Sequence, residues 1–157
     1  MAKNKYEKYI NYDQEYVKEH PPGSMPGFIG VSIGKEQVKE AKVHCGYAWY
    51  LGSIPKSETY KPHYHDSDEI ITIIGTDPND AFNLGGEVDF WFEHEKYTIT
   101  KTCMIYIPAG VQHAPLWFRK VTKPIISGTV NLGEGLIPIP LDNPDPMFTE
   151  FKDIIKR

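Results

Sequence analysis

Three side chains that can bind a metal lie close together in one short stretch of the chain. His63 and His65 are two residues apart, which places both imidazoles on one side of a β-strand but on nearly opposite sides of a helix. Pro62 before them and the turn-forming residues 66–68 after them favour a strand that ends in a turn. Glu69 opens the next strand and, in a hairpin, folds back towards the histidines. Two imidazoles and a carboxylate are typical ligands of a first-row transition metal.

A fourth candidate ligand, His113, stands at the start of a later strand. It follows a turn in which Pro108 fixes φ and Gly110 can adopt a positive φ. Because the conformation of this turn is restricted, the position of His113 relative to the preceding strand is fixed. The alternative interpretation is that these histidines are surface or buried structural residues that bind no metal.

The rest of the chain supplies strands that can hold these residues. Short runs rich in Ile, Val, Thr, Tyr, Phe and Trp are bounded by Gly, Pro, Asn or Asp, as is typical of strands. The 13 glycines and 13 prolines among 157 residues indicate many turns, and no amphipathic helix separates the runs. This pattern predicts a single all-β barrel or sandwich. The predicted strands are 28–33, 43–51, 58–65, 69–74, 87–92, 96–100, 103–107 and 124–130.

The two ends of the chain differ from its centre. Residues 1–27 are polar and tyrosine-rich and end in a Pro/Gly cluster, which predicts an N-terminal arm with one helical segment. The barrel then spans 28–140, with a polar surface loop at 75–86. Residues 141–157 form a C-terminal tail that is predicted to be a helix packed against the barrel, because its apolar residues recur at helical spacing. These apolar residues are Phe148, Phe151, Ile154 and Ile155.

The two histidine motifs together resemble those of the cupin family. The stretch from His63 to Glu69 is similar to the first cupin motif, H-x-H-x3–4-E followed by a glycine, and the stretch from Pro108 to His113 is similar to the second, P-x-G-x-x-H. The resemblance covers roughly residues 43–130. It implies a small single-domain cupin, a double-stranded β-helix or jelly-roll-like barrel, with one divalent transition metal (Fe, Mn, Ni, Zn or Cu). The metal ligands that it implies are His63, His65, Glu69 and His113.

Four aromatic residues are candidates for the pocket around such a metal. Tyr47 and Trp49 alternate on a strand that should border the site, and Phe90 lies on another strand, so all three could line a substrate pocket. The alternative for each of them is ordinary packing in the barrel core. Tyr106 could reach the pocket as a catalytic acid or hydrogen-bond donor, and its alternative is also core packing.

Arg119 is a candidate for binding a substrate. Extended alternation from His113 places Arg119 on the inward side of its strand. Its two-pronged guanidinium could then clamp a substrate carboxylate. The alternative, a charge that faces solvent at the end of a strand, is the more common environment of an arginine.

The predicted function is the binding or conversion of a small polar or carboxylated molecule at open metal positions. The metal would act as a Lewis acid, as in an isomerase, decarboxylase or lyase, or as an oxygen-activating centre, as in a dioxygenase. The alternative is a ligand-binding or sensing module without catalysis. The sequence does not decide between an enzyme and such a module, because one fold supports all these functions.

The composition of the chain disfavours several other partners. Seventeen Lys and Arg against 21 Asp and Glu give a net charge of −4 and no basic stripe, so no nucleic-acid partner is expected. No apolar run approaches the ~18–20 residues of a membrane span, and the first twenty residues do not resemble a signal peptide. Cys45 and Cys103 form no pair that suggests a disulfide framework. We therefore expect a cytoplasmic protein, and a homodimer because the arm has no core of its own.

Overall fold

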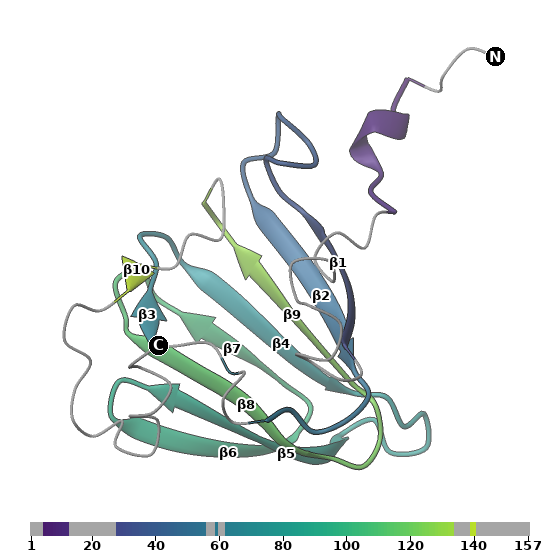
Figure 1. Cartoon of the computed structure of the whole chain (residues 1–157), viewed down its shortest axis with the longest axis vertical. Coiled ribbons are helices and arrows are strands. Elements are labelled where there is room, and N and C mark those ends of the chain that lie inside the picture. Colours follow the sequence, from purple (N-terminus) through teal and green to yellow (C-terminus); the bar gives the residue numbers. More distant parts are fainter. Residues whose placement is uncertain (1–4, 13–27, 56–58, 60–61, 134–138, 141–157) are drawn as a thin grey trace.

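The regular secondary structure of the described residues is almost entirely antiparallel strands, which form two five-stranded sheets, as the computed structural model shows (Figure 1). In spatial order, sheet A contains β1 (Phe28–Ile33), β2 (His44–Tyr50), β9 (Ile125–Asn131), β4 (Glu69–Gly75) and β7 (Cys103–Ile107). Sheet B contains β10 (Ile139–Pro140), β3 (His63–Tyr64), β8 (His113–Val121), β5 (Asn83–Phe92) and β6 (Glu95–Lys101). This architecture confirms the all-β prediction. The structure describes residues 5–12, 28–55, 59, 62–133 and 139–140.

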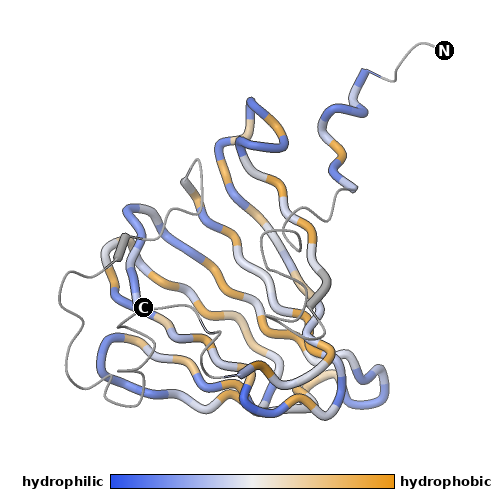
Figure 2. Tube along the Cα trace, in the orientation of Figure 1, coloured by the Kyte–Doolittle hydropathy of each residue, from blue (hydrophilic) through white to orange (hydrophobic). Residues whose placement is uncertain are grey.

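The core lies between the inner faces of the two sheets. Side chains alternate between this core and the outside along strands such as β4. Figure 2 shows that hydrophobic positions occur along the strands of both sheets. Ile73 and Ile125 of sheet A and Phe118 of sheet B are almost fully buried. The ring of Tyr50 stacks on Phe118 with 3.7 Å between the ring centroids, which joins the two sheets across the core.

Each predicted strand overlaps an observed strand, with differences at the ends. The expected strand 58–65 is paired only over the two residues of β3. The expected surface loop 75–86 is shorter than predicted, because β5 already begins at Asn83 and crosses the sheet with a register shift before Val88. A shift of this kind lets a glycine-containing polar stretch join a strand that the hydrophobic pattern alone does not reveal.

The described part of the N-terminal arm contains one short 3-10 helix, Glu7–Tyr9. Asn11 donates a hydrogen bond of 2.7 Å from its Nδ2 to the carbonyl of Ser32, which ties the arm to β1. The rest of the arm and the predicted C-terminal helix over 141–157 lie outside the described residues. In the part of the chain that the structure describes, no helix has the length and apolar character to cross a membrane.

Candidate metal centre

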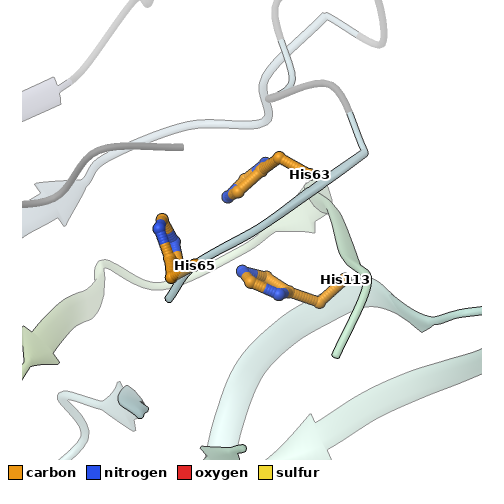
Figure 3. A group of neighbouring side chains, drawn as sticks. All are labelled: His63, His65 and His113. Carbon is orange, nitrogen blue, oxygen red and sulfur yellow. The ribbon is translucent and has the colours of Figure 1, made fainter. Parts of the chain in front are cut away.

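Three histidines converge at one end of the barrel. The antiparallel pairing of β3 with β8 places His63 directly opposite His113, and His65 follows just after β3. One ring nitrogen of each histidine lies within 4.8 Å of the others. Figure 3 shows the three imidazoles pointing towards one another. This group could hold a metal ion, as the spacing of the histidines in the sequence predicts.

The turn before His113 is hydrogen-bonded to the turn after His65. Gly110 has the positive φ that the sequence predicts, 80°, and its N–H donates to the carbonyl of His65 over 2.8 Å. The N–H of Ala109 donates to Oδ1 of Asp68 over 2.9 Å. These two bonds hold the separate histidine motifs in one fixed arrangement.

The orientation of the His113 ring is set by the backbone behind it. Its Nδ1 lies 3.0 Å from the carbonyl oxygen of Val111, and because a carbonyl can only accept, Nδ1 carries the proton. In the neutral imidazole, Nε2 then carries the lone pair that can bind a metal, whereas in the protonated imidazole Nε2 donates towards Glu69. A hydrogen bond from the second ring nitrogen is the usual way in which a protein orients a metal-binding histidine.

Glu69 is buried beside the three histidines. Its Oε2 lies 3.1 Å from Nε2 of His113 and 3.4 Å from Nε2 of His65, and its Oε1 accepts a hydrogen bond from the hydroxyl of Thr129. Burial alone would raise the pKa of Glu69, but His113, His65 and Thr129 together hold it well below its usual range. Glu69 is thus a carboxylate at neutral pH.

The contacts around Glu69 fit a cation better than they fit hydrogen bonds. Within the described residues, Oε2 of Glu69 and Nε2 of His113 are buried and have no aligned hydrogen-bond partner. Buried polar atoms of this kind are rare and normally indicate a missing partner. A divalent transition metal accepts lone pairs from both atoms at once, so the donor set suits such an ion.

A cavity of about 110 Å³ adjoins the histidines. Most of its wall is apolar and comes from both sheets. Phe90 lines it, in the place that the sequence predicts for a pocket residue, and it is 1% exposed. The other apolar side chains in this wall include Ala48, Tyr50, Ile71 and Leu116.

His44 also lines the cavity, although its position in the sequence gave no reason to include it. Its Nε2 is buried and has no hydrogen-bond partner among the described residues. Burial lowers its pKa, and the nearby charges of Glu36 and Glu69 only partly oppose this effect. Gly34 makes room for the ring, since a Cβ at Gly34 would lie 2.7 Å from Nδ1 of His44. His44 is therefore a neutral polar group on a largely apolar wall.

Tyr47 and Trp49 were predicted to line the pocket, and this prediction is wrong for their side chains. Alternation along β2 directs His44 and Ala48 inwards, whereas the side chains of Tyr47 and Trp49 are 50% and 37% exposed on the other face. Tyr47 borders the cavity, but its side chain shares the outer face with Trp49. The signal that could have identified His44 is this same alternation, because a shift of one residue exchanges the two faces of a strand.

Tyr106 was a candidate to reach the pocket, but its side chain lies outside it. Its neighbour Ile107 is buried in the core, so Tyr106 points outwards on β7 and is 57% exposed. Its hydroxyl donates a hydrogen bond of 2.6 Å to Oδ2 of Asp68. Tyr106 therefore lies outside the pocket and cannot act there as an acid.

Arg119 is also outside the pocket, contrary to the inward position that simple alternation predicts. Its Nη2 lies 2.6 Å from Oε2 of Glu87, and its Nε lies 3.1 Å from Oδ2 of Asp89, both on the outer side of sheet B. The observed position agrees with the alternative of a charge at the solvent-facing side of a strand.

The physical reason for the reversal of Arg119 is a bulge between His113 and Leu116. The ladder of β5 and β8 pairs Phe90 with Leu116 but pairs Phe92 with His113. One extra residue on β8 therefore lies in this interval. This bulge shifts the alternation, so that Phe118 instead of Arg119 faces the core. Arg119 follows Phe118 on the outer side, in a second register shift between the pairs Val88–Phe118 and Glu87–Lys120.

Several solved structures are similar to this chain. The polyketide cyclase RemF from Streptomyces resistomycificus is 10% identical, with a TM-score of 0.50 over 84% of each chain. The DMSP lyase DddQ from Ruegeria pomeroyi is 21% identical, with a TM-score of 0.48 over 77% of this chain and 54% of that one. A cupin superfamily protein from Desulfitobacterium hafniense is 13% identical, with a TM-score of 0.42 over 65% of this chain and 75% of that one. This chain therefore spans about half the length of DddQ.

No family model and no curated protein matches the chain. At these low identities, the likeness to solved structures concerns the fold alone. Two packed antiparallel sheets bring the stretch from His63 to Glu69 together with the stretch from Pro108 to His113, as the resemblance implies. The chain has a cupin fold.

Proposed function

We propose that the protein binds one divalent transition metal and uses it to hold a small oxygen-bearing organic molecule in the adjoining cavity. The observation that carries this proposal is the convergence of three imidazoles and one buried carboxylate at the end of an apolar pocket. The proposed ligands are His63, His65, Glu69 and His113.

The charges of the proposed ligands suit this role. Three neutral imidazoles and the Glu69 carboxylate would leave a divalent ion with a net charge of +1, which favours an anionic or electron-rich ligand. When bound, the metal supplies Lewis-acid chemistry, as in a lyase or isomerase, or a site for dioxygen, as in a dioxygenase. Thr129 and the carbonyl of Val111 keep Glu69 and His113 in the orientation that this binding requires.

The walls of the cavity restrict the ligand. None of the described residues that line it is a lysine or arginine, and Arg119 lies on the outer side of sheet B. A carboxylate or carbonyl would therefore be held by the metal and by His44, with its apolar remainder against side chains such as Phe90 and Leu116. We infer a small molecule with one oxygen-bearing end and an apolar body.

His44 is the candidate for the proton-handling group that an enzyme of this type needs. A neutral imidazole with an unsatisfied Nε2 can donate or accept a hydrogen bond from a bound ligand. The second candidate function, a non-catalytic binding module, is favoured by the otherwise apolar wall and by the position of Tyr106 outside the pocket. The two functions therefore differ in what His44 does.

Elemental analysis of the purified protein tests the metal site. We expect close to one transition-metal ion per chain, and a loss of at least about tenfold in bound metal in His63→Ala and His113→Ala. His94→Ala is the control, because it removes an exposed histidine in the β5–β6 turn. Circular dichroism checks that each variant keeps its β-structure. Full metal content in both ligand variants would refute the proposed site.

Binding of acetate to the cobalt-loaded protein tests His44. We expect His44→Ala to keep its cobalt but to bind acetate about five- to tenfold more weakly, since one hydrogen bond contributes roughly 1 kcal/mol. The change in the visible cobalt spectrum on titration gives the affinity, and His94→Ala should match the wild type. An unchanged affinity in His44→Ala would remove His44 from the ligand site and leave the metal proposal intact.

A further inference from the structure

The outer face of sheet A has no charged side chain on β2, β9, β4 or β7. On this face the strand register aligns eleven residues in three rows. We call these residues the apolar face: Cys45, Val130, Ile70 and Tyr106; Tyr47, Gly128, Thr72 and Met104; and Trp49, Ile126 and Ile74. All of them are exposed or half-buried. The solvent side of an antiparallel sheet normally carries polar residues, so this composition requires an explanation.

The accessible area of the apolar face approaches that of a protein interface. Met104 is 73% exposed, Tyr47 is 50% exposed and Tyr106 is 57% exposed. Together with Trp49 and Ile74, these side chains leave roughly 500 Å² accessible, since each large side chain of this kind has about 150–250 Å² to bury. The half-buried members add to this area. A standard interface buries about 800 Å² on each partner.

We propose that a second copy of this chain packs against the apolar face and forms a homodimer by contact of sheet with sheet. Interface cores are enriched in tyrosine, tryptophan and methionine and depleted of charge, which is the composition of this face. The four strands of the face carry no charge that could select a different partner, and the carboxylate of Asp68, which lies beside the face, accepts a hydrogen bond from Tyr106. A two-fold axis brings the same face of two copies together, so a single apolar surface satisfies both.

The N-terminal arm adds apolar surface next to the same sheet. Tyr6, Tyr9, Ile10 and Tyr12 are all exposed. The hydrogen bond from Asn11 holds the arm at β1, the edge strand next to β2 (Figure 1). A second copy that lies over sheet A can cover both surfaces, whereas neither is covered by the described part of its own chain.

Sedimentation velocity of the whole protein from about 1 to 100 μM tests this proposal. We expect the wild type to sediment as a dimer, and the double variant Tyr47→Lys/Met104→Lys to have a dimer dissociation constant at least about 100-fold higher, because it buries unpaired ammonium groups. Phe82→Lys and Leu132→Lys are the controls. They place the same charge at exposed apolar residues outside the apolar face, and both should remain dimeric.

Two outcomes would overturn the proposal. The first is a wild-type monomer at every concentration, which would point to residues 141–157 or a different protein as the cover of the apolar face. The second is a dimer that persists in the double variant, which would place the interface elsewhere. The circular dichroism and metal content of the double variant show whether it has folded, and both should match the wild type because the substituted side chains point away from the cavity.

Discussion

The outer faces of the two sheets differ in composition, because sheet B carries charged residues on its outer side and sheet A carries mainly apolar ones. Sheet B covers its outer side with an ion network, in which Asp89 lies 3.0 Å from Nζ of Lys96 and 3.1 Å from Nε of Arg119. Sheet A presents the apolar face, on which the described strands β2, β9, β4 and β7 carry no charge. Sheet B is thus satisfied within one chain, whereas sheet A is completed by a partner in our proposal. Two sheets of one barrel can therefore have separate roles, one in stability and one in association.

Asp89 is the central residue of the network on sheet B. It is fully buried and accepts a further hydrogen bond of 2.8 Å from the hydroxyl of Thr98. Burial alone would raise its pKa, but Thr98, Lys96 and Arg119 together lower it. The charge of the carboxylate is thus compensated by its neighbours on the outer side of sheet B, where Trp91 is buried as well.

Removal of Asp89 should have the largest effect on stability. We expect Asp89→Ala to lower the free energy of unfolding by about 2–3 kcal/mol, because it breaks a buried ion pair and leaves Thr98 without its acceptor. The loss should stay below that of a fully buried pair, since the side chains of Lys96 and Arg119 are 41% and 38% exposed and regain water. Urea unfolding followed by circular dichroism, at one fixed protein concentration, measures the difference.

The matched control for this variant is Glu87→Ala. Glu87 contacts the same arginine at the more exposed rim of the network, where an ion pair contributes only about 0–1 kcal/mol. Equal losses in the two variants would show that Asp89 has no special place in the network and would weaken the contrast between the two faces.

The contribution of Asp89 should also depend on pH. Its pKa is lower in the folded than in the unfolded chain, so its stabilising effect is complete above the unfolded value of 3.8 and is lost as the pH falls through the folded value. The gap in unfolding free energy between the wild type and Asp89→Ala should therefore be constant from pH 7 to about 5 and should narrow at lower pH. A gap that stays the same down to pH 3 would contradict the lowered pKa.

The smallest predicted effect concerns the apolar face. Because a dimer is favoured by mass action, the melting temperature of the wild type should rise by a few degrees for a hundredfold increase in concentration. The melting temperature of Tyr47→Lys/Met104→Lys should be independent of concentration. Differential scanning fluorimetry across this range gives both curves. A wild-type melting temperature that does not change with concentration would show that the protein does not dimerise. The outer face of sheet A, like that of sheet B, would then have no role in association.

The sequence was sufficient for the fold class and for the histidine cluster. Spacings such as that of His63 and His65 depend only on local geometry, and Gly110 has the backbone conformation that its turn requires. Phe90 lines the cavity because the pairing of β5 with β6 is regular from Val88 to Phe92 and keeps its side chain on the inner face.

The rest of the site depended on which way each strand faces. The facing of β2 determines whether His44 or Tyr47 points into the cavity. The hydrophobic pattern does not predict this facing, because both faces of β2 carry apolar residues. For Arg119, one bulged residue after His113 was enough to reverse the result. Features of this kind arise from contacts between distant strands, which a pattern within one segment does not contain.

The pairing of His63 with His113 has a consequence for how the protein folds. These residues come from distant parts of the sequence, since β4, β5, β6 and β7 all lie between β3 and β8 along the chain. Pairings with such a large loop form slowly, because the entropy of loop closure is lost before the contact is gained. The hairpin of β5 and β6 can form early, whereas the histidine cluster should be among the last parts to assemble. An ion that binds there would therefore recognise the completed barrel and not an intermediate on the way to it.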